Sequence, residues 1–170
     1  FTTGSSVRNL TYTSFSGVGS TVGGGVIYGN MTLSATQTIS SSASTSSFGA
    51  TSGIKTITTN GVLIPRALVF QGVGGTWSLQ DALTVSATLS IAVNAGTLTT
   101  NGYAVTCGKF GTSSSFATGN RVLNMGASTF TCLGTSGTNT SWQVEDGAYL
   151  FTVNPGTSTI YLAETFTEME

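Results

Sequence analysis

Three carboxylate side chains within residues 54–163 are the residues that could most directly perform catalysis. Asp81, Glu145 and Asp146 are of the type that glycoside hydrolysis uses, where two carboxyl groups stand about 5–9.5 Å apart. Glu145 and Asp146 are adjacent, so on a strand they would point to opposite faces, and we expect them to begin a turn into Gly147. We expect Asp81 to follow a strand and to form hydrogen bonds in a turn. A glycan-depolymerase site is therefore an alternative that would need a second subunit.

Other catalytic residue types are missing or lack the neighbours that they need. The sequence has no histidine, and Lys55 and Lys109 stand in no Ser-x-x-Lys context, so the serines have no base to activate them. Cys107 and Cys132 cannot supply the four ligands of a zinc site. We therefore predict no enzyme activity, catalytic residue, cofactor or metal site. The two cysteines are expected to be small buried residues, and a disulfide is the alternative if they occupy stacked neighbouring turns.

Threonines separated by one residue recur along the chain and suggest binding to ice. On one flat face of a stacked β-structure, such pairs would resemble the surface of β-helical antifreeze proteins. A flat ladder needs one pair in every coil, whereas these pairs are spaced irregularly, and threonine favours strands in any case. Ice binding therefore stays an alternative. The pairs are Thr11/Thr13, Thr36/Thr38, Thr56/Thr58, Thr97/Thr99, Thr129/Thr131, Thr138/Thr140, Thr157/Thr159 and Thr165/Thr167.

The composition is poor in charge and rich in small neutral polar residues. Only five basic and six acidic side chains occur among 170 residues, while Ser, Thr and Gly make up nearly half of the chain. We predict no nucleic-acid partner, because phosphate binding needs clustered Lys and Arg, and the basic residues here are scattered. We predict no membrane partner, because no apolar run approaches the about 20 residues of a membrane span. The chain begins at Phe1 and shows no signal peptide, which we interpret as processing or a fragment.

Apolar and small polar residues alternate in several stretches, as they do in half-buried β-strands. The longest such stretch is 83–93, and shorter strands are expected within 10–15, 26–33, 121–125 and 149–153. Five aromatic residues are expected to fill the interior or to cover its ends: Trp77, Phe110, Phe130, Trp142 and Phe151. Turns are expected at Asn60-Gly61, Gly74-Gly75, Asn101-Gly102, Asp146-Gly147 and Asn154-Pro155-Gly156.

Internal repeats connect these short strands. Residues 56–64 match 97–105, residues 126–130 match 156–160, and Gly75-Thr76-Trp77 is echoed by Gly96-Thr97-Leu98. Short strands, Asn-Gly turns and repeats predict an all-β fold, a parallel β-solenoid (β-helix), in which stacked coils share one apolar interior. An antiparallel β-sandwich or jelly roll is the alternative.

The chain divides into three expected parts. Residues 1–53 form a low-complexity Ser/Thr/Gly-rich segment with short strands, which a partner could order. Residues 54–163 form the repeat domain, and residues 164–170 form an acidic tail.

Two stretches, 74–85 and 96–110, resemble Ser/Thr/Gly-rich repeat proteins encoded by tailed bacteriophages, marine phages especially, and by some bacteria, which are adhesin-like. The resemblance covers residues 52 to about 162 and carries no catalytic residue that could be transferred. It implies a structural protein on a virion surface or outside the cell, such as a tail fibre, decoration or tail-associated component. The expected partners are further copies of the chain, as a homo-oligomer such as a trimer, other virion proteins and a cell-surface glycan. A glycan- or receptor-binding adhesin module is the alternative function.

Overall fold

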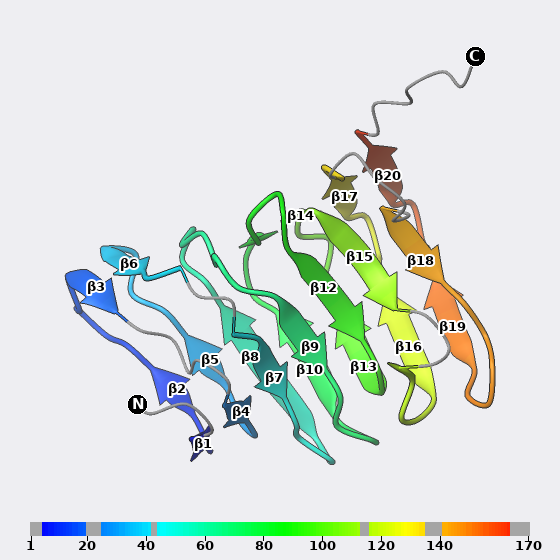
Figure 1. Cartoon of the computed structure of the whole chain (residues 1–170), viewed down its shortest axis with the longest axis horizontal. Helices are drawn as coiled ribbons and strands as arrows, with labels where there is room; N and C mark the ends of the chain where they lie inside the picture. The colour runs from blue at the N-terminus through cyan, green and yellow to red at the C-terminus, as the bar shows by residue number, and fades with distance from the viewer. Residues whose placement is uncertain (1–4, 20–24, 42–43, 113–115, 135–140, 164–170) are drawn as a thin grey trace.

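The chain winds into a stack of coils whose strands form long parallel sheets. The computed structural model describes residues 5–19, 25–41, 44–112, 116–134 and 141–163. Two seven-stranded sheets run along the stack, accompanied by a four-stranded and a two-stranded sheet. Figure 1 shows the strands side by side, from the N-terminus at one end of the molecule to the C-terminus at the other. The predicted all-β solenoid is confirmed, and the antiparallel alternative is wrong.

A typical coil contributes one strand to each of three sides. Sheet 1 contains β1 (Ser6–Val7), β4 (Val26–Ile27), β7 (Ser46–Phe48), β9 (Leu68–Phe70), β12 (Ser90–Val93), β15 (Lys109–Thr112) and β18 (Trp142–Val144). Sheet 2 contains β2 (Leu10–Thr11), β5 (Met31–Thr32), β8 (Ile54–Thr58), β10 (Thr76–Leu79), β13 (Gly96–Thr99), β16 (Arg121–Asn124) and β19 (Phe151–Asn154). Sheet 3 contains β11 (Leu83–Thr84), β14 (Val105–Cys107), β17 (Thr129–Cys132) and β20 (Thr159–Leu162), and β3 (Gly17–Gly19) pairs with β6 (Gln37–Ile39). None of the described elements is a helix with the length and apolarity that crossing a membrane would need.

Two of the internal repeats lie on neighbouring coils and in register. Trp77 of β10 pairs with Leu98 of β13, which aligns the two Gly-Thr-apolar segments. Phe130 of β17 pairs with Ile160 of β20, which aligns the second pair of matching segments. These repeats in the sequence are therefore the stacking units of the solenoid.

The third repeat is out of register. Thr76 of β10 pairs with Thr97 on one side and with Ile54 on the other, so Thr97 is level with Ile54 and not with its sequence match, Thr56. The two matching segments nevertheless lie on the coils that flank β10. The shift is by an even number of residues, so each side chain still points to the face that its counterpart occupies. Sequence similarity here reflects the inside–outside pattern more than the strand pairing.

The alternating stretch 83–93 is two strands rather than the one that its pattern predicts. β11 and β12 belong to different sheets, and Ala87 and Thr88 are exposed at the corner between them. The apolar residues on either side of the corner point inward and are buried. A period of two does not reveal such a corner, because the alternation continues on both sides of it.

Asn-Gly pairs follow β8 and β13 and turn the chain toward the third side. Asn60 and Asn101 have φ of 51° and 55°, and the glycine after each also has a positive φ. Asn and Gly adopt this conformation at low cost, as the sequence predicts. Thr59, just before the first pair, is buried and donates its hydroxyl to the carbonyl of Ala82 at 2.8 Å. Each turn is thus tied to the next coil.

A column of apolar side chains fills the stack. Trp77, Phe110 and Phe130 are fully buried, Phe151 is 7% exposed, and Trp142 packs partly buried against the core. Phe110 stacks on Trp142 with ring centroids 4.8 Å apart, and Phe130 meets both rings edge-on. Each buried side chain of this size stabilises the fold by roughly 1.5–3 kcal/mol. The predicted interior role of these aromatic residues is confirmed.

Short polar side chains face one another from coil to coil on the outer face of sheet 2. Ser78 lies beside Thr99, Thr99 beside Asn124, and Asn124 beside Asn154. Asn154 Nδ2 donates to Asn124 Oδ1 at 2.7 Å, and Asn124 Nδ2 donates to Thr99 Oγ1 at 3.1 Å. Side chains of like charge at these stacked positions would repel one another across a strand spacing of about 4.8 Å. Stacking therefore favours neutral polar residues outside.

The described residues before position 54 continue the same sheets. β4 pairs with β7, and β7 pairs with β9, so sheet 1 crosses the expected boundary at 53/54 without a break. Two Gly- or Ser-rich stretches of the low-complexity segment, 21–25 and 40–47, lie partly outside the described residues, and the tail 164–170 lies wholly outside them. Ordering of the first segment by a partner stays a prediction.

Candidate functional site

The carboxylate of Asp81 holds a turn of the preceding coil. Its Oδ1 accepts a hydrogen bond from the backbone N–H of Thr59 at 2.8 Å and lies 3.2 Å from the Thr59 hydroxyl, whose single proton the carbonyl of Ala82 also approaches. Its Oδ2 accepts from the backbone N–H of Asn60. The expectation that Asp81 bonds within a turn is confirmed, and both of its oxygens serve that turn.

Glu145 and Asp146 lie at a different corner, between β18 and β19 of the last described coil. Asp146 Oδ1 accepts from the N–H of Phe151, and Glu145 Oε1 accepts from Gln143 Nε2 at 2.6 Å. The structure therefore does not bring Asp81 and these two acids to one site. Among the described residues, no group of three or more His, Cys, Asp and Glu side chains could hold a metal ion.

Arg121 lies inside the stack beneath this acidic corner. It is fully buried, and its Nη2 donates to the carbonyls of Glu145 at 2.6 Å and Tyr149 at 3.1 Å. Its guanidinium carbon lies 4.8 Å from the ring centroid of Phe151. Burial lowers the pKa of Arg121, while the nearby charges of Asp146 and Glu145 raise it. The guanidinium anchors the corner from within, a role that its place in an expected strand does not reveal.

Cys107 of β14 lies directly beside Cys132 of β17 on the neighbouring coil. Both are fully buried, and no disulfide joins them. A hydrogen bond with Cys132, together with burial, raises the pKa of Cys107. The expectation of two small buried residues is confirmed, and so is the stacking on which the disulfide alternative depends.

The Thr-x-Thr pairs are distributed over more than one sheet. Thr56/Thr58 in β8 and Thr97/Thr99 in β13 share sheet 2, but β10 lies between them. Thr129/Thr131 lie in β17 of sheet 3. The pairs at 138/140 and 165/167 fall outside the described residues. The described pairs form no continuous threonine face.

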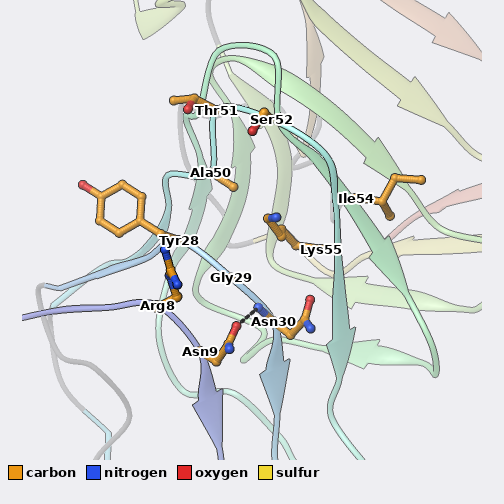
Figure 2. A pocket seen from close by; sticks show the side chains of 10 residues that line it. All are labelled: Arg8, Asn9, Tyr28, Gly29, Asn30, Ala50, Thr51, Ser52, Ile54 and Lys55. Carbon is orange, nitrogen blue, oxygen red and sulfur yellow. Dashed lines mark hydrogen bonds between the residues drawn. The ribbon is translucent and has the colours of Figure 1, made fainter.

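An open pocket of about 470 Å³ lies near the N-terminal end, where the chain passes from sheet 1 to sheet 2. Three successive coils line it with equivalent segments, 8–9 after β1, 28–30 after β4 and 50–55 after β7. Figure 2 shows these side chains around the corner, with Tyr28 on one side and Lys55 and Asn30 on the other. Its volume is in the range of small-molecule binding sites.

Two asparagines build one wall of the pocket by linking successive coils. Asn9 Oδ1 accepts the backbone N–H of Asn30, and Asn30 Oδ1 accepts that of Thr56, both at 2.9 Å. A Cβ at Gly29 would lie 2.1 Å from Asn9 Oδ1 and 2.2 Å from the carbonyl oxygen of Arg8, so the wall needs glycine there.

Sequence reasoning did not find this pocket, because it treated Arg8 and Lys55 as scattered cations. One signal was present, since Asn9-Leu10-Thr11 recurs as Asn30-Met31-Thr32. The strand pairing places Leu10 beside Met31, so the two asparagines stand at equivalent positions of neighbouring coils.

The last described coil leaves inward-facing apolar side chains uncovered. Ile160 and Leu162 of β20 pair with Phe130 and Cys132, which are fully buried, so they occupy interior positions. They are nevertheless 40% and 51% exposed. Trp142 at the start of β18 is also only partly buried. Among the residues that the structure describes, none covers this end of the column.

Comparisons with known proteins add no relative: no family model, curated protein or solved structure matches this chain.

Proposed function

We propose that the chain is a structural component of a virion surface, such as a fibre, decoration or tail-associated protein, that acts through rigid assembly. The observation that carries the proposal is the open last coil, where Ile160 and Leu162 occupy interior positions yet face solvent. An uncovered sheet edge with exposed apolar residues favours pairing with another chain. The virion setting is supported by the resemblance of residues 74–85 and 96–110 to phage repeat proteins.

The occupant that fits this end best is the first coil of a second copy. β1 lies in the same sheet as β18, and β2 lies in the same sheet as β19; all four strands run parallel to their neighbours. A head-to-tail contact of this kind is heterologous and builds either rings or filaments. Ser6, Val7, Leu10 and Thr11 of the first strands are uncharged, so no buried charge would be created where they meet β18 and β19.

The test compares two leucine variants of matched exposure by light scattering at rising protein concentration. Leu162→Ser removes an apolar group from the open end, whereas Leu63→Ser changes a leucine that is 52% exposed after the Asn60-Gly61 turn. The exposed half of a leucine contributes about 1.4 kcal/mol when another chain buries it. Because about 1.4 kcal/mol corresponds to a factor of ten, losing it should weaken association roughly tenfold. We expect this loss for Leu162→Ser, and wild-type association for Leu63→Ser. Equal behaviour of the two variants, or a wild-type chain that stays monomeric throughout, would contradict the proposal.

A further inference from the structure

The pocket at segments 8–9, 28–30 and 50–55 holds much of the chain's accessible positive charge. Arg66 and Arg121 are buried, which leaves Arg8, Lys55 and Lys109 as the basic residues that solvent reaches. Two of these three line the pocket, and no acidic residue does. In a chain with so little charge, this concentration marks the pocket as a site for an anion.

The two asparagine side chains and the two cations leave the pocket rich in hydrogen-bond donors. The oxygens of Asn9 and Asn30 are occupied by backbone N–H groups, so their Nδ2 amides are the groups left over. Neither Nδ2 has a hydrogen-bond partner among the residues that the structure describes. Together with the Arg8 guanidinium and the Lys55 ammonium, they match the oxygens of a carboxylate or sulfate.

The size and the aromatic wall of the pocket narrow the ligand class further. At about 470 Å³ the pocket is much larger than one inorganic anion requires. The Tyr28 ring is 47% exposed and combines an apolar face with a polar tip, which suits the face of a sugar ring. Two cations at one corner do not form the basic track that a nucleic-acid backbone needs.

We propose that this pocket binds an acidic saccharide, with its oxyanion held by Arg8 and Lys55 and its ring against Tyr28. The donor-rich wall of Asn9 and Asn30 lies beside the two cations and would contact the oxygens next to the charged group. Binding does not require assembly, but Arg8 and Asn9 lie between β1 and β2 of the first coil, which the proposed head-to-tail contact would also use.

Calorimetric titration of the full chain with four probes tests the ligand class. We expect a short oligogalacturonate or dextran sulfate to bind, with an affinity that falls as salt is raised. The oligogalacturonate identifies a carboxylate ligand, and dextran sulfate identifies a sulfated one. Equal binding of neutral dextran, tighter binding of a single-stranded oligonucleotide, or no binding of either acidic probe would overturn the proposal.

Matched variants test the location of the site. Lys55→Gln and Arg8→Gln should each weaken binding of the acidic probe roughly tenfold, because hydrogen bonds to charged groups are the stronger ones. Lys109→Gln removes the same charge outside the pocket and should bind as the wild type does. Tyr28→Ala should weaken binding of the oligogalacturonate. An equal loss in Lys109→Gln and Lys55→Gln would show attraction to overall charge only and would overturn the assignment, as would unchanged binding in Lys55→Gln.

Discussion

At the scale of single residues, Gly96 shows how closely successive coils approach. Its φ is +77°, and a Cβ there would lie 2.5 Å from the carbonyl oxygen of Gly72 and 2.7 Å from that of Gly75. Gly61 has nearly the same φ, +79°, but a Cβ there meets nothing within 4 Å. Comparing substitutions at these two glycines therefore distinguishes the cost of a left-handed backbone from the cost of a steric contact between coils.

Alanine at these two positions should destabilise the protein by different amounts. Gly61→Ala should lower the free energy of unfolding by about 1–2 kcal/mol, which is the cost of the left-handed conformation. Gly96→Ala should lower it by roughly 3 kcal/mol or more, because two backbone carbonyls must also move. Urea denaturation measures both losses. Equal losses would show that the close approach at Gly96 is not what requires glycine.

The candidate sites differ in how far the sequence predicts them. The turn role of Asp81 follows from its neighbours in the chain and is confirmed by its bonds to Thr59 and Asn60. The pocket could not be found in this way, because Arg8 and Lys55 come together only through the stacking of three coils. The register of a solenoid depends on loop lengths that residue patterns do not specify.

At the scale of elements, the pairing of β14 with β17 places the thiols of Cys107 and Cys132 side by side. The raised pKa of Cys107, caused by the hydrogen bond with Cys132 and by burial, keeps its thiol protonated in the folded state. In the unfolded chain the same thiol ionises around its ordinary pKa of 9.0. Its contribution to stability is therefore complete below that pH and is lost progressively above it.

Stability should consequently fall more steeply with alkaline pH in the wild type than in a chain without these thiols. Above the ordinary thiol pKa the unfolded state binds fewer protons than the folded state, which costs up to about 1.4 kcal/mol per pH unit for the Cys107 thiol. Urea midpoints of the two proteins between about pH 8 and pH 10 measure this slope. An equally steep fall in a Cys107→Ala/Cys132→Ala variant would contradict the assignment.

The sequence predicts which stretches form strands better than it predicts where each strand begins and ends. Alternation identified the strands around 121–125 and 149–153, which the structure gives as β16 and β19. The same alternation predicts one strand where the structure has two, β11 and β12, because the corner at Ala87 and Thr88 does not interrupt it. Corners between sheets are set by backbone conformation, which a pattern of apolar residues does not record. The sequence marks such a corner only where an Asn-Gly pair stands.

At the scale of the whole molecule, the repeats were sufficient to predict a solenoid. Segments with matching sequences, such as those containing Phe130 and Ile160, proved to be neighbours in the stack. The open end could not be predicted, because Ile160 has the pattern of a buried residue and yet is 40% exposed in the last coil that the structure describes. Assembly through that end is the central claim.

Hydrogen–deuterium exchange of the β20 backbone tests that claim most directly, with β17 as the internal reference because it is paired on both sides. We predict that amides of Ile160 and Leu162 exchange slowly at high protein concentration and rapidly after dilution, while those of β17 remain slow at both. Rapid exchange in β20 at every concentration would show that no second copy covers the last coil, and would contradict the account.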